Sequence, residues 1–516
     1  MAHLKPGVVC FAPEHSHLGL IARLNKLCIE KKLHFLPAML FAGKTWIGPF
    51  VNPETPGCWM CAILRLASNL PSADAAMLWK GLALADTTWQ ASDALDQPAA
   101  RILGNAVAFE VFKALVGHLP PESAGALLSQ DLKTLETERC PVAAHPQCPV
   151  CCCKNQVDQA KTLSATVLHN PDSAILPQEQ LEKARKWQHP LTGFLSCFED
   201  EDRDQLPLFA TSITIRHGST ESKRVVGAVS PESLLDARRR ALYGAIANYA
   251  SLMPARINKN WTSEETVDLI TPESIFNWSG RVPAVDTETN TRLPGFSLSR
   301  RCIVMVPAGA VYPATQLNAR GVYESTAAGV AVGTTFDEVV RAGTLSALAY
   351  QAMHRFASGS AAAFSLDAGR LRCLDPELDY LFKLTDRMGR APRLYALGGT
   401  DSLSVVMATD PSAGHPRYAA GYSLAEAARQ ALLELVGQLQ DHNLYTSADL
   451  PWFAQNPQPS FHASLPDERY DRAHSFQQAC EGVFSAGGDL LYFNLTPADV
   501  MRDGWLIAGR VLIVNP

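Results

Sequence analysis

Two pairs of cysteines carry the clearest chemical signal in the sequence: Cys58 with Cys61, and Cys148 with Cys151. Two residues separate the cysteines of each pair, a gap that lets a tight turn direct both sulfur atoms at one point. Two such pairs supply the four thiolates of a tetrahedral structural zinc site, with no open position left for activating water. The spacing therefore predicts a structural Zn²⁺ that joins distant parts of one domain.

The other cysteines need a separate interpretation, because the total of 13 is odd and cannot be a complete set of disulfides. Cys152 and Cys153 directly follow the second pair; we interpret them as spare thiols that could compete as ligands. Six of the remaining seven lie in apolar or mixed surroundings and are interpreted as ordinary buried cysteines: Cys10, Cys28, Cys197, Cys302, Cys373 and Cys480.

Composition narrows the class of protein. The chain has 516 residues, 47% of them hydrophobic and 19% charged, which excludes a disordered or fibrous protein and allows several domains with cores. A net charge of -6 gives no basic field for nucleic acid. We find no signal peptide and no apolar run of about 18 residues. We therefore expect a cytoplasmic protein without nucleic-acid or membrane partners.

The elements that must position these residues fall into two regions. Residues 7–153 mix strand-like runs with helical patterns at 18–31 and 104–119, and a polar stretch at 154–188 is interpreted as a linker. Residues 189–516 form the second region. It repeats one plan three times, a glycine-containing turn followed by a Ser/Thr helix start and a long amphipathic helix, at 227–249, 333–356 and 421–439. Strand-like segments between these helices predict an α+β or α/β fold, with long helices packed against sheets.

The helix starts are predicted in detail. Ser230 is expected to cap the first helix with Pro231 at its first position. Thr335 with Glu338, and Ser423 with Glu426, are placed as capping boxes for the second and third helices.

The first region resembles the C-terminal half of the E1/ThiF-like partner proteins of thiazole/oxazole-modified microcin biosynthesis. The residues that carry this resemblance are those at 24–25, 46–49 and 56–61, Arg65, and the run at 145–151 that ends with the second cysteine pair. The resemblance implies a zinc-stapled ThiF-like α/β fragment.

The second region is similar to the YcaO cyclodehydratase domain, which occurs fused to that partner or beside it. The residues that carry this resemblance lie at 189–193, 325–333, 431–434, 494–499 and 509–511. The family performs ATP-dependent chemistry on a precursor peptide: a Cys, Ser or Thr side chain attacks the preceding amide, ATP phosphorylates the oxygen, and loss of phosphate leaves a thiazoline or oxazoline.

The resemblance also implies partners. The match begins near residue 8, without the winged-helix domain that usually grips the leader peptide, so a separate leader-binding subunit is expected beside the precursor peptide. An active YcaO subunit and a flavin dehydrogenase are further expected partners in an oligomeric complex. The match ends at Pro516, short of the proline-rich tail of family members.

The expected nucleotide site departs from the family pattern. YcaO proteins pair glutamates three residues apart on their long helices, so that both carboxylates share a face and hold Mg²⁺ against the ATP phosphates. Here those positions fall on Gly244 and Ala247 in the first helix and on Gln351 and His354 in the second. The lysine of the preceding turn falls on Val226. The remaining candidates for nucleotide binding are Gln351, His354, Arg355, Glu434 and Gln438, the last next to Gly437.

Three hypotheses follow. The first is a subunit of an azoline-forming cyclodehydratase complex in ribosomal peptide natural product biosynthesis, a scaffold or regulatory YcaO-like chain with an impaired ATP site. The alternative is an active ATP-dependent and Mg²⁺-dependent cyclodehydratase that recruits Glu324 or Asp337 beside the candidates above. The third is related thioamide or amidine chemistry.

Overall fold

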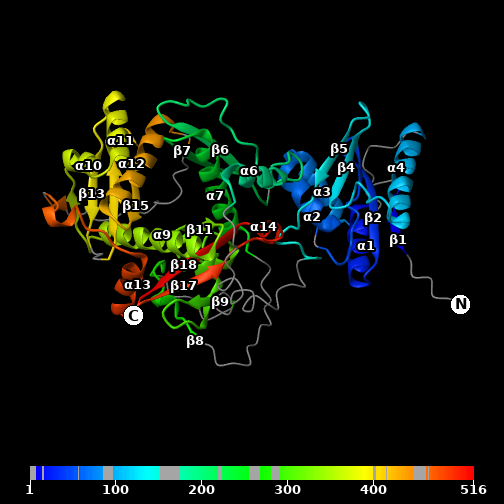
Figure 1. Ribbon diagram of the computed structural model, residues 1–516. Helices are drawn as coiled ribbons and strands as arrows, with labels where there is room; N and C mark the ends of the chain where they lie inside the picture. Colours follow the sequence, from blue (N-terminus) through cyan, green and yellow to red (C-terminus); the bar gives the residue numbers. More distant parts are fainter. Residues whose placement is uncertain are drawn as a thin grey trace. The chain divides into compact units, whose positions relative to one another are not determined.

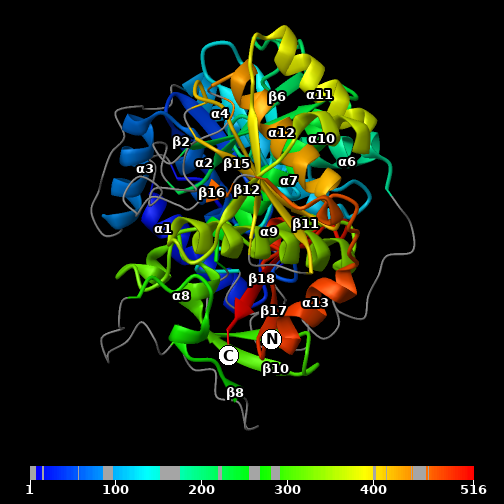
Figure 2. The same cartoon turned by 90° about the vertical axis from the view of Figure 1, so that its left-hand side faces the viewer.

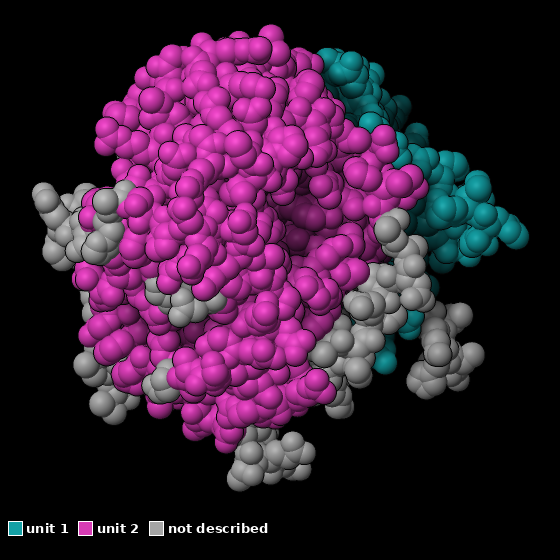
Figure 3. Space-filling view, turned by 60° about the vertical axis from the view of Figure 1, so that its left-hand side comes forward, with its two compact units in different colours: residues 1–157, 182–197, 214–224 teal, residues 158–181, 198–213, 225–516 magenta. Residues whose placement is uncertain are grey.

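The computed structural model forms two compact units. The first unit comprises residues 1–157, 182–197 and 214–224, and the second comprises 158–181, 198–213 and 225–516 (Figure 3). The structure describes residues 7–13, 17–55, 57–84, 97–151, 175–218, 223–254, 268–280, 291–398, 402–413, 415–442, 444, 461–462 and 464–515. Cys152, Cys153 and most of the predicted linker lie outside these residues.

The first unit is built on a five-stranded sheet in the order β1-β2-β3-β4-β5 (Figure 1). The strands are β1 (Val8–Phe11), β2 (His34–Phe41), β3 (Lys44–Ile47), β4 (Ala126–Asp131) and β5 (Thr137–Pro141). β1 pairs parallel with β2, and the remaining neighbours pair antiparallel. A parallel pair needs a crossover connection, and α1 (Leu18–Glu30) provides it.

The alternation of side chains along β2 explains why helices cover both faces of this sheet. Phe35 and Met39 belong to a core cluster shared with α1 and α2 (Trp59–Asn69). Leu36 and Ala38 belong to a second cluster, shared with α4 (Gln97–Val116). Odd-numbered and even-numbered residues of a strand point to opposite faces of the sheet, so β2 is buried on both sides. Figure 1 shows α4 on one side of the sheet and α2 with α3 (Ser72–Ala83) on the other.

The second unit contains two larger sheets. One has the order β11-β18-β17-β9-β10-β8 and the other β15-β14-β13-β12-β16. Their strands are β8 (Asp268–Leu269), β9 (Arg292–Ser297), β10 (Ile303–Pro307), β11 (Val330–Gly333), β12 (Ala363–Ser365), β13 (Arg393–Leu397), β14 (Ser404–Thr409), β15 (Arg417–Gly421), β16 (Phe461–His462), β17 (Asp489–Asn494) and β18 (Ile507–Val514). A separate pair is formed by β6 (Phe209–Arg216) and β7 (Lys223–Ser230).

Three long helices pack against these sheets as predicted: α7 (Leu234–Leu252), α9 (Phe336–Ala357) and α12 (Leu424–Gln440). Val405 and Met407 of β14 share a core cluster with α9, β17 and β18, whereas Val406 and Ala408 share another with α12. Helix α9 thus shares a core with β14 of one sheet and with β17 and β18 of the other, and it lies between the two sheets (Figure 2). The expectation of long helices against sheets is confirmed.

Shorter helices complete both units. They are α6 (Pro177–Ala184), η3 (Arg185–Trp187), η4 (Pro272–Ser274), α8 (Ala308–Val311), η5 (Gln316–Asn318), α10 (Ala368–Leu374), α11 (Pro376–Arg387), η6 (Asp467–Arg469), α13 (Phe476–Ser485) and α14 (Ala498–Met501).

The helix starts differ partly from expectation. The cap of α7 is Ser233, whose hydroxyl accepts a hydrogen bond from the Asp236 amide; the prediction of Ser230 with Pro231 is wrong, because strand β7 continues through Ser230. The capping box of Thr335 and Glu338 is confirmed. At α12, Ser423 accepts from the Glu426 amide, but the Glu426 carboxylate accepts from the Tyr422 amide, so only half of the predicted box forms.

Candidate functional site

The four cysteines predicted to bind zinc meet in the first unit. Cys58 caps the N-terminus of α2 and Cys61 lies in its first turn, while Cys148 and Cys151 lie in the turns after β5. The sulfur of Cys58 is 3.9 Å from that of Cys61 and 3.6 Å from that of Cys148, and the sulfurs of Cys61 and Cys151 are 3.3 Å apart. All four sulfur atoms lie within 4.8 Å of one another.

These separations fit a tetrahedral zinc ion. Zinc–sulfur bonds of about 2.3 Å at tetrahedral angles place neighbouring sulfurs about 3.8 Å apart, close to the observed distances. Three of the four cysteines are buried and Cys151 is half-buried. The amide of Val150 donates to the sulfur of Cys148 over 3.4 Å, a contact that stabilises a thiolate ligand. The residues present therefore fit structural Zn²⁺.

Burial and mutual hydrogen bonds shift the pKa values of these thiols in different directions. Burial raises the pKa of Cys61 well above its ordinary value, and the hydrogen bond with Cys151 raises that of Cys148. The hydrogen bond with Cys148 lowers the pKa of Cys58. Four adjacent sulfurs cannot all ionise without a compensating charge, so a metal ion would bind with release of protons.

Two further residues of the resemblance border this cluster. Arg65 is buried, with its guanidinium 5.2 Å from the centre of the Phe194 ring. Burial, followed by the charge of Arg65, lowers the pKa of His145 well below its usual range. A neutral imidazole accepts at Nδ1 from the amide of Gln147, which fixes the turn before Cys148.

The interpretation of the other cysteines is only partly correct. Cys28 and Cys480 are buried as expected and Cys302 is half-buried, but Cys10, Cys197 and Cys373 are exposed. Cys10 lies on β1, which ends the sheet order, so apolar neighbours in sequence do not enclose it.

In the second unit three of the five segments that carry the YcaO resemblance, 325–333, 494–499 and 509–511, meet in one sheet, whereas 431–434 lies on α12 and 189–193 belongs to the first unit. β11 pairs with β18, placing Val330 opposite Arg510, and β17 pairs with β18, placing Asn494 opposite Gly509. The buried Arg510 guanidinium donates to the carbonyls of Val311 and Thr326. Burial lowers its pKa to about 9. These segments therefore build the structural base of the unit.

Helix α7 is attached to this base through its buried face. The hydroxyl of Tyr249 donates to the buried Asp499 carboxylate over 2.8 Å. Gly244 and Ala247 lie on the half-exposed face of the same helix. A side chain at Gly244 would begin 3.0 Å from a methyl group of Val226, the residue at the expected lysine position. Two apolar positions and one glycine thus replace the groups expected to bind metal and phosphate.

On α9 the candidates are bonded within the protein. His354 Nε2 lies 3.6 Å from one Glu324 carboxylate oxygen, and the Tyr350 hydroxyl donates to the other. Burial alone would raise the pKa of Glu324, but the bonds with His354 and Tyr350 hold it below its ordinary value. The Gln351 amide donates to the Asn515 side chain over 3.2 Å. Arg355 is exposed.

The sequence analysis missed the residues through which α9 contacts the glycine-rich segment 325–333. A side chain at Gly343 would begin 2.8 Å from the Gly329 carbonyl oxygen, and the Ser346 hydroxyl accepts from the Gly329 amide over 3.1 Å. These positions precede Gln351 and His354 by one to three turns. A glycine inside a long helix was the available signal, because it marks a close backbone approach. Neither position carries a carboxylate.

On α12 the candidates also have partners in the protein. The Glu434 carboxylate accepts a hydrogen bond from the side-chain amide of Gln430, one turn earlier, over 2.9 Å. Gln438 is buried, and its carbonyl oxygen accepts from Arg417 of β15 over 2.8 Å. A buried amide used in this way is a structural contact of the sheet with its covering helix.

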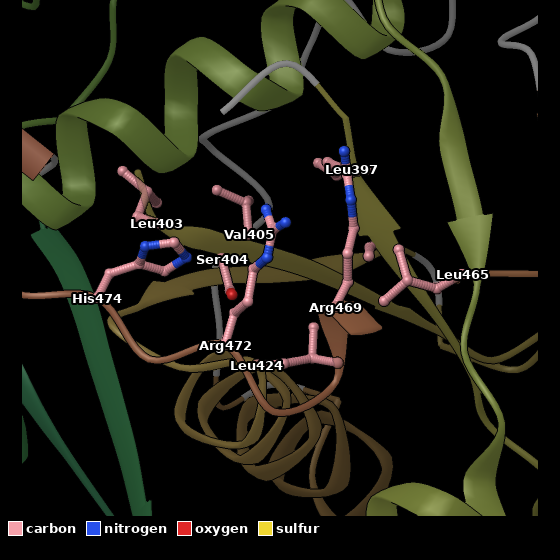
Figure 4. A pocket seen from close by; sticks show the side chains of 10 residues that line it. Leu397, Leu403, Ser404, Val405, Leu424, Leu465, Arg469, Arg472 and His474 are labelled. Atoms are coloured by element: carbon pink, nitrogen blue, oxygen red, sulfur yellow. The ribbon is translucent and has the colours of Figure 1, made fainter. Parts of the chain in front are cut away.

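A small hollow of about 40 Å³, open to solvent, lies elsewhere in the second unit (Figure 4). Apolar residues of β13, β14 and α12, such as Leu397, Val405 and Leu424, line it together with Arg469, Arg472 and His474. None of the predicted nucleotide-site residues lines it. Figure 3 shows that the surface of this unit is deeply hollowed on the face drawn there.

Comparison with solved structures identifies the fold. A heterocyclase solved with substrate and cofactor matches with a TM-score of 0.69 and 14% identity, over 99% of this chain and 76% of that chain. The heterocyclase TruD matches with a TM-score of 0.59 and 17% identity, over 99% of this chain and 74% of that chain. YcaO from Methanopyrus kandleri, bound with AMPPCP and Mg²⁺, has a TM-score of 0.48 at 17% identity, over 65% of this chain and 90% of that chain. No family model and no curated protein matches the sequence.

The chain therefore has the fold of the heterocyclases over nearly its whole length, and the fold predicted from the resemblance is confirmed. Among the residues that the structure describes, no helix is both long and apolar enough to cross a membrane.

Proposed function

We propose that this chain is a scaffold or regulatory subunit of an azoline-forming cyclodehydratase complex that modifies a ribosomal precursor peptide. The observation that carries the proposal is the combination of a heterocyclase fold over 99% of the chain with Gly244 and Ala247 on the open face of α7. The long helices are in place, but these two positions offer no side chain that binds Mg²⁺.

The other helices support the same proposal. Magnesium requires several oxygen ligands in octahedral geometry and is usually held by carboxylates together with phosphate oxygens. Glu324, which precedes β11, is bonded to His354 and Tyr350 of α9, and an imidazole is an unsuitable ligand for Mg²⁺. On α12, Gln438 is held by Arg417. The residues predicted for the nucleotide site do not fit a complete ATP–Mg²⁺ site, and we derive no reaction step through one.

The cysteine tetrad supplies the second part of the proposal, a structural Zn²⁺ held by Cys58, Cys61, Cys148 and Cys151. Such an ion would tie the start of α2 to the turn that follows β5, across 90 residues of sequence. Four thiolates leave no open position, so its role would be to stabilise the first unit.

The partners follow from the same reasoning. A chain of this kind would act with a separate leader-binding subunit, with an active YcaO subunit that supplies ATP chemistry, and with a flavin dehydrogenase that oxidises the rings. The division of labour between residues 7–153 and 189–516, joined by a linker at 154–188, is part of this proposal.

Isothermal titration calorimetry with ATP and Mg²⁺ tests the scaffold proposal on the full-length chain. We expect no micromolar binding by the chain alone. The matched control is the chain with Gly244→Glu and Ala247→Glu, which returns two carboxylates to one face of α7. Micromolar binding by the unmodified chain would reject the scaffold proposal.

The alternative function is an active cyclodehydratase with a rearranged site, and it is favoured by the retained acid Glu434 and by Glu324, which such a site could recruit. Its test is incubation of the chain with ATP, a cysteine-rich precursor peptide and a leader-binding subunit, followed by mass spectrometry. The alternative expects the loss of one water per ring formed; the scaffold proposal expects this loss only after an active YcaO subunit is added.

A further inference from the structure

A second group of metal-binding side chains lies in the first unit and shares no residue with the cysteine tetrad. It consists of Glu138, Cys140 and His189, and one potential ligand atom from each lies within 4.8 Å of the other two. Glu138 and Cys140 are two residues apart on β5, so their side chains leave the strand on the same face. His189 follows the short helix η3, far away in sequence.

The three side chains differ in exposure in a way that suits a bound ion. Cys140 is fully buried, the His189 side chain is 15% exposed, and the Glu138 side chain is 49% exposed. The group is thus closed by the protein on the cysteine side and accessible to solvent on the glutamate side. Neither the zinc tetrad nor the nucleotide-site candidates use any of these residues.

We propose that Glu138, Cys140 and His189 form a second metal site, which takes a divalent ion of the zinc type. A thiolate, an imidazole and a carboxylate are the ligands found in zinc sites with three protein ligands, where a water molecule takes the fourth position. Thiolate and imidazole favour zinc over magnesium or calcium. One thiolate and one carboxylate balance the charge of the ion, and the imidazole binds neutral.

The hydrogen bonds around His189 specify how the site loads. The Leu191 amide donates to Nδ1 over 3.2 Å, so without metal the neutral ring carries its proton on Nε2, which lies 3.2 Å from Glu138 Oε1. When Nε2 binds the ion, this proton moves to Nδ1 and the contact with Leu191 opens. The Cys140 thiol gives its proton to solvent. Loading thus replaces two hydrogen bonds by three metal–ligand bonds.

The site is close to the core that holds the tetrad. Cys140 belongs to the same hydrophobic cluster as Cys58, Cys61 and Cys148, and Leu191 packs against that cluster. An ion bound by Cys140 and His189 would fasten the segment around residues 185–193 to β5. The first unit would then hold two metal ions of different chemistry, one enclosed by four sulfurs and one accessible to solvent.

Equilibrium dialysis of the full-length, reduced protein against micromolar ZnCl₂ tests this proposal, with bound zinc measured by elemental mass spectrometry. We expect two zinc ions per chain in the unmodified protein and one fewer after Cys140→Ala. The matched control is Cys28→Ala, which removes another buried cysteine of the same core cluster and should leave the count unchanged.

His189→Ala provides a second route to the same loss, because its imidazole is partly exposed and its removal leaves the cluster around Cys140 packed. Circular dichroism of each variant verifies the fold. Substituting Co²⁺ for zinc adds a spectroscopic readout, since the thiolate-to-cobalt absorbance should fall in Cys140→Ala and not in Cys28→Ala. The proposal is overturned if Cys140→Ala and Cys28→Ala bind equal amounts of zinc.

Discussion

The cysteine tetrad of the first unit and the helix faces of the second show two different relations between a fold and its chemistry. In the first unit all four cysteines meet within 4.8 Å, and most of them are buried. In the second unit the chain has a heterocyclase fold, yet Gly244, Ala247 and Val226 stand where the resemblance places the ligands of a nucleotide. A fold can therefore persist through its apolar core while the polar residues of a site change.

The largest expected effect concerns the tetrad. Cys148→Ser should abolish structural zinc binding and unfold the first unit, because structural zinc in small domains contributes about 10–16 kcal/mol of apparent binding free energy. Zinc content and protease resistance of the first unit measure this effect. Cys480→Ser, at a buried cysteine of the second unit, serves as the control and should retain the zinc. Retention of full zinc by Cys148→Ser would remove the tetrad from the proposal.

The packing of α12 should matter more than its polar candidates. Leu432 is fully buried, so Leu432→Ala should lower the free energy of unfolding by about 2–5 kcal/mol. Glu434→Gln, two positions along the same helix and half-buried, should have a much smaller effect, which urea unfolding can compare directly. Equal losses from the two variants would contradict the view that this helix is retained for its packing.

The Glu324 cluster should give the second unit an acid-sensitive stability. The folded-state pKa of Glu324 lies below its ordinary value of 4.5, so its carboxylate stabilises the protein above about pH 4.5, and this contribution disappears as pH falls through the folded pKa. Glu324→Gln should remove that dependence and about 1.5–3 kcal/mol of stability at neutral pH, as expected for hydrogen bonds to a charged group.

Urea unfolding between pH 3 and pH 7 measures this contribution, with the exposed Glu468→Gln as the control. If both variants follow the same pH profile as the unmodified protein, the bonds of Glu324 with Tyr350 and His354 do not stabilise the fold.

The smallest expected effect is at the start of α9. Thr335→Ala removes one half of the capping box with Glu338 and should reduce stability by about 1 kcal/mol. Thermal unfolding of the second unit can detect this difference. Thr335→Ser, which keeps the hydroxyl acceptor, should restore most of the loss; equal stability of Thr335→Ala and the unmodified chain would show that the cap contributes nothing.

Much of the fold could be predicted from the sequence because its signals are local. Apolar periodicity predicted α1, α7, α9 and α12, and hydroxyl residues identified two of the three helix starts. The error at Ser230 arose because strand β7 continues through this residue, whose hydroxyl accepts from the Glu232 amide, so that the helix begins only after Ser233.

Of the candidate sites, the cysteine tetrad could be predicted from the sequence, whereas the contacts between distant segments could not. The two cysteine pairs could be recognised because each lies within one turn of chain. By contrast, the contact of Ser346 with Gly329, and the group of Glu138, Cys140 and His189, join residues whose separation in sequence carries no pattern.

The sequence by itself determined the types of side chain available: four cysteines in two tight pairs, and small or apolar residues where carboxylates were expected on α7. The tertiary structure decided which of these groups meet. Strand alternation buried both faces of β2 and β14, pairing with β18 aligned the segments around Gly329 and Asn494, and packing brought His189 to β5. The physical reason is that ligand chemistry belongs to single residues, whereas a site requires distances between residues, which only the packed core fixes.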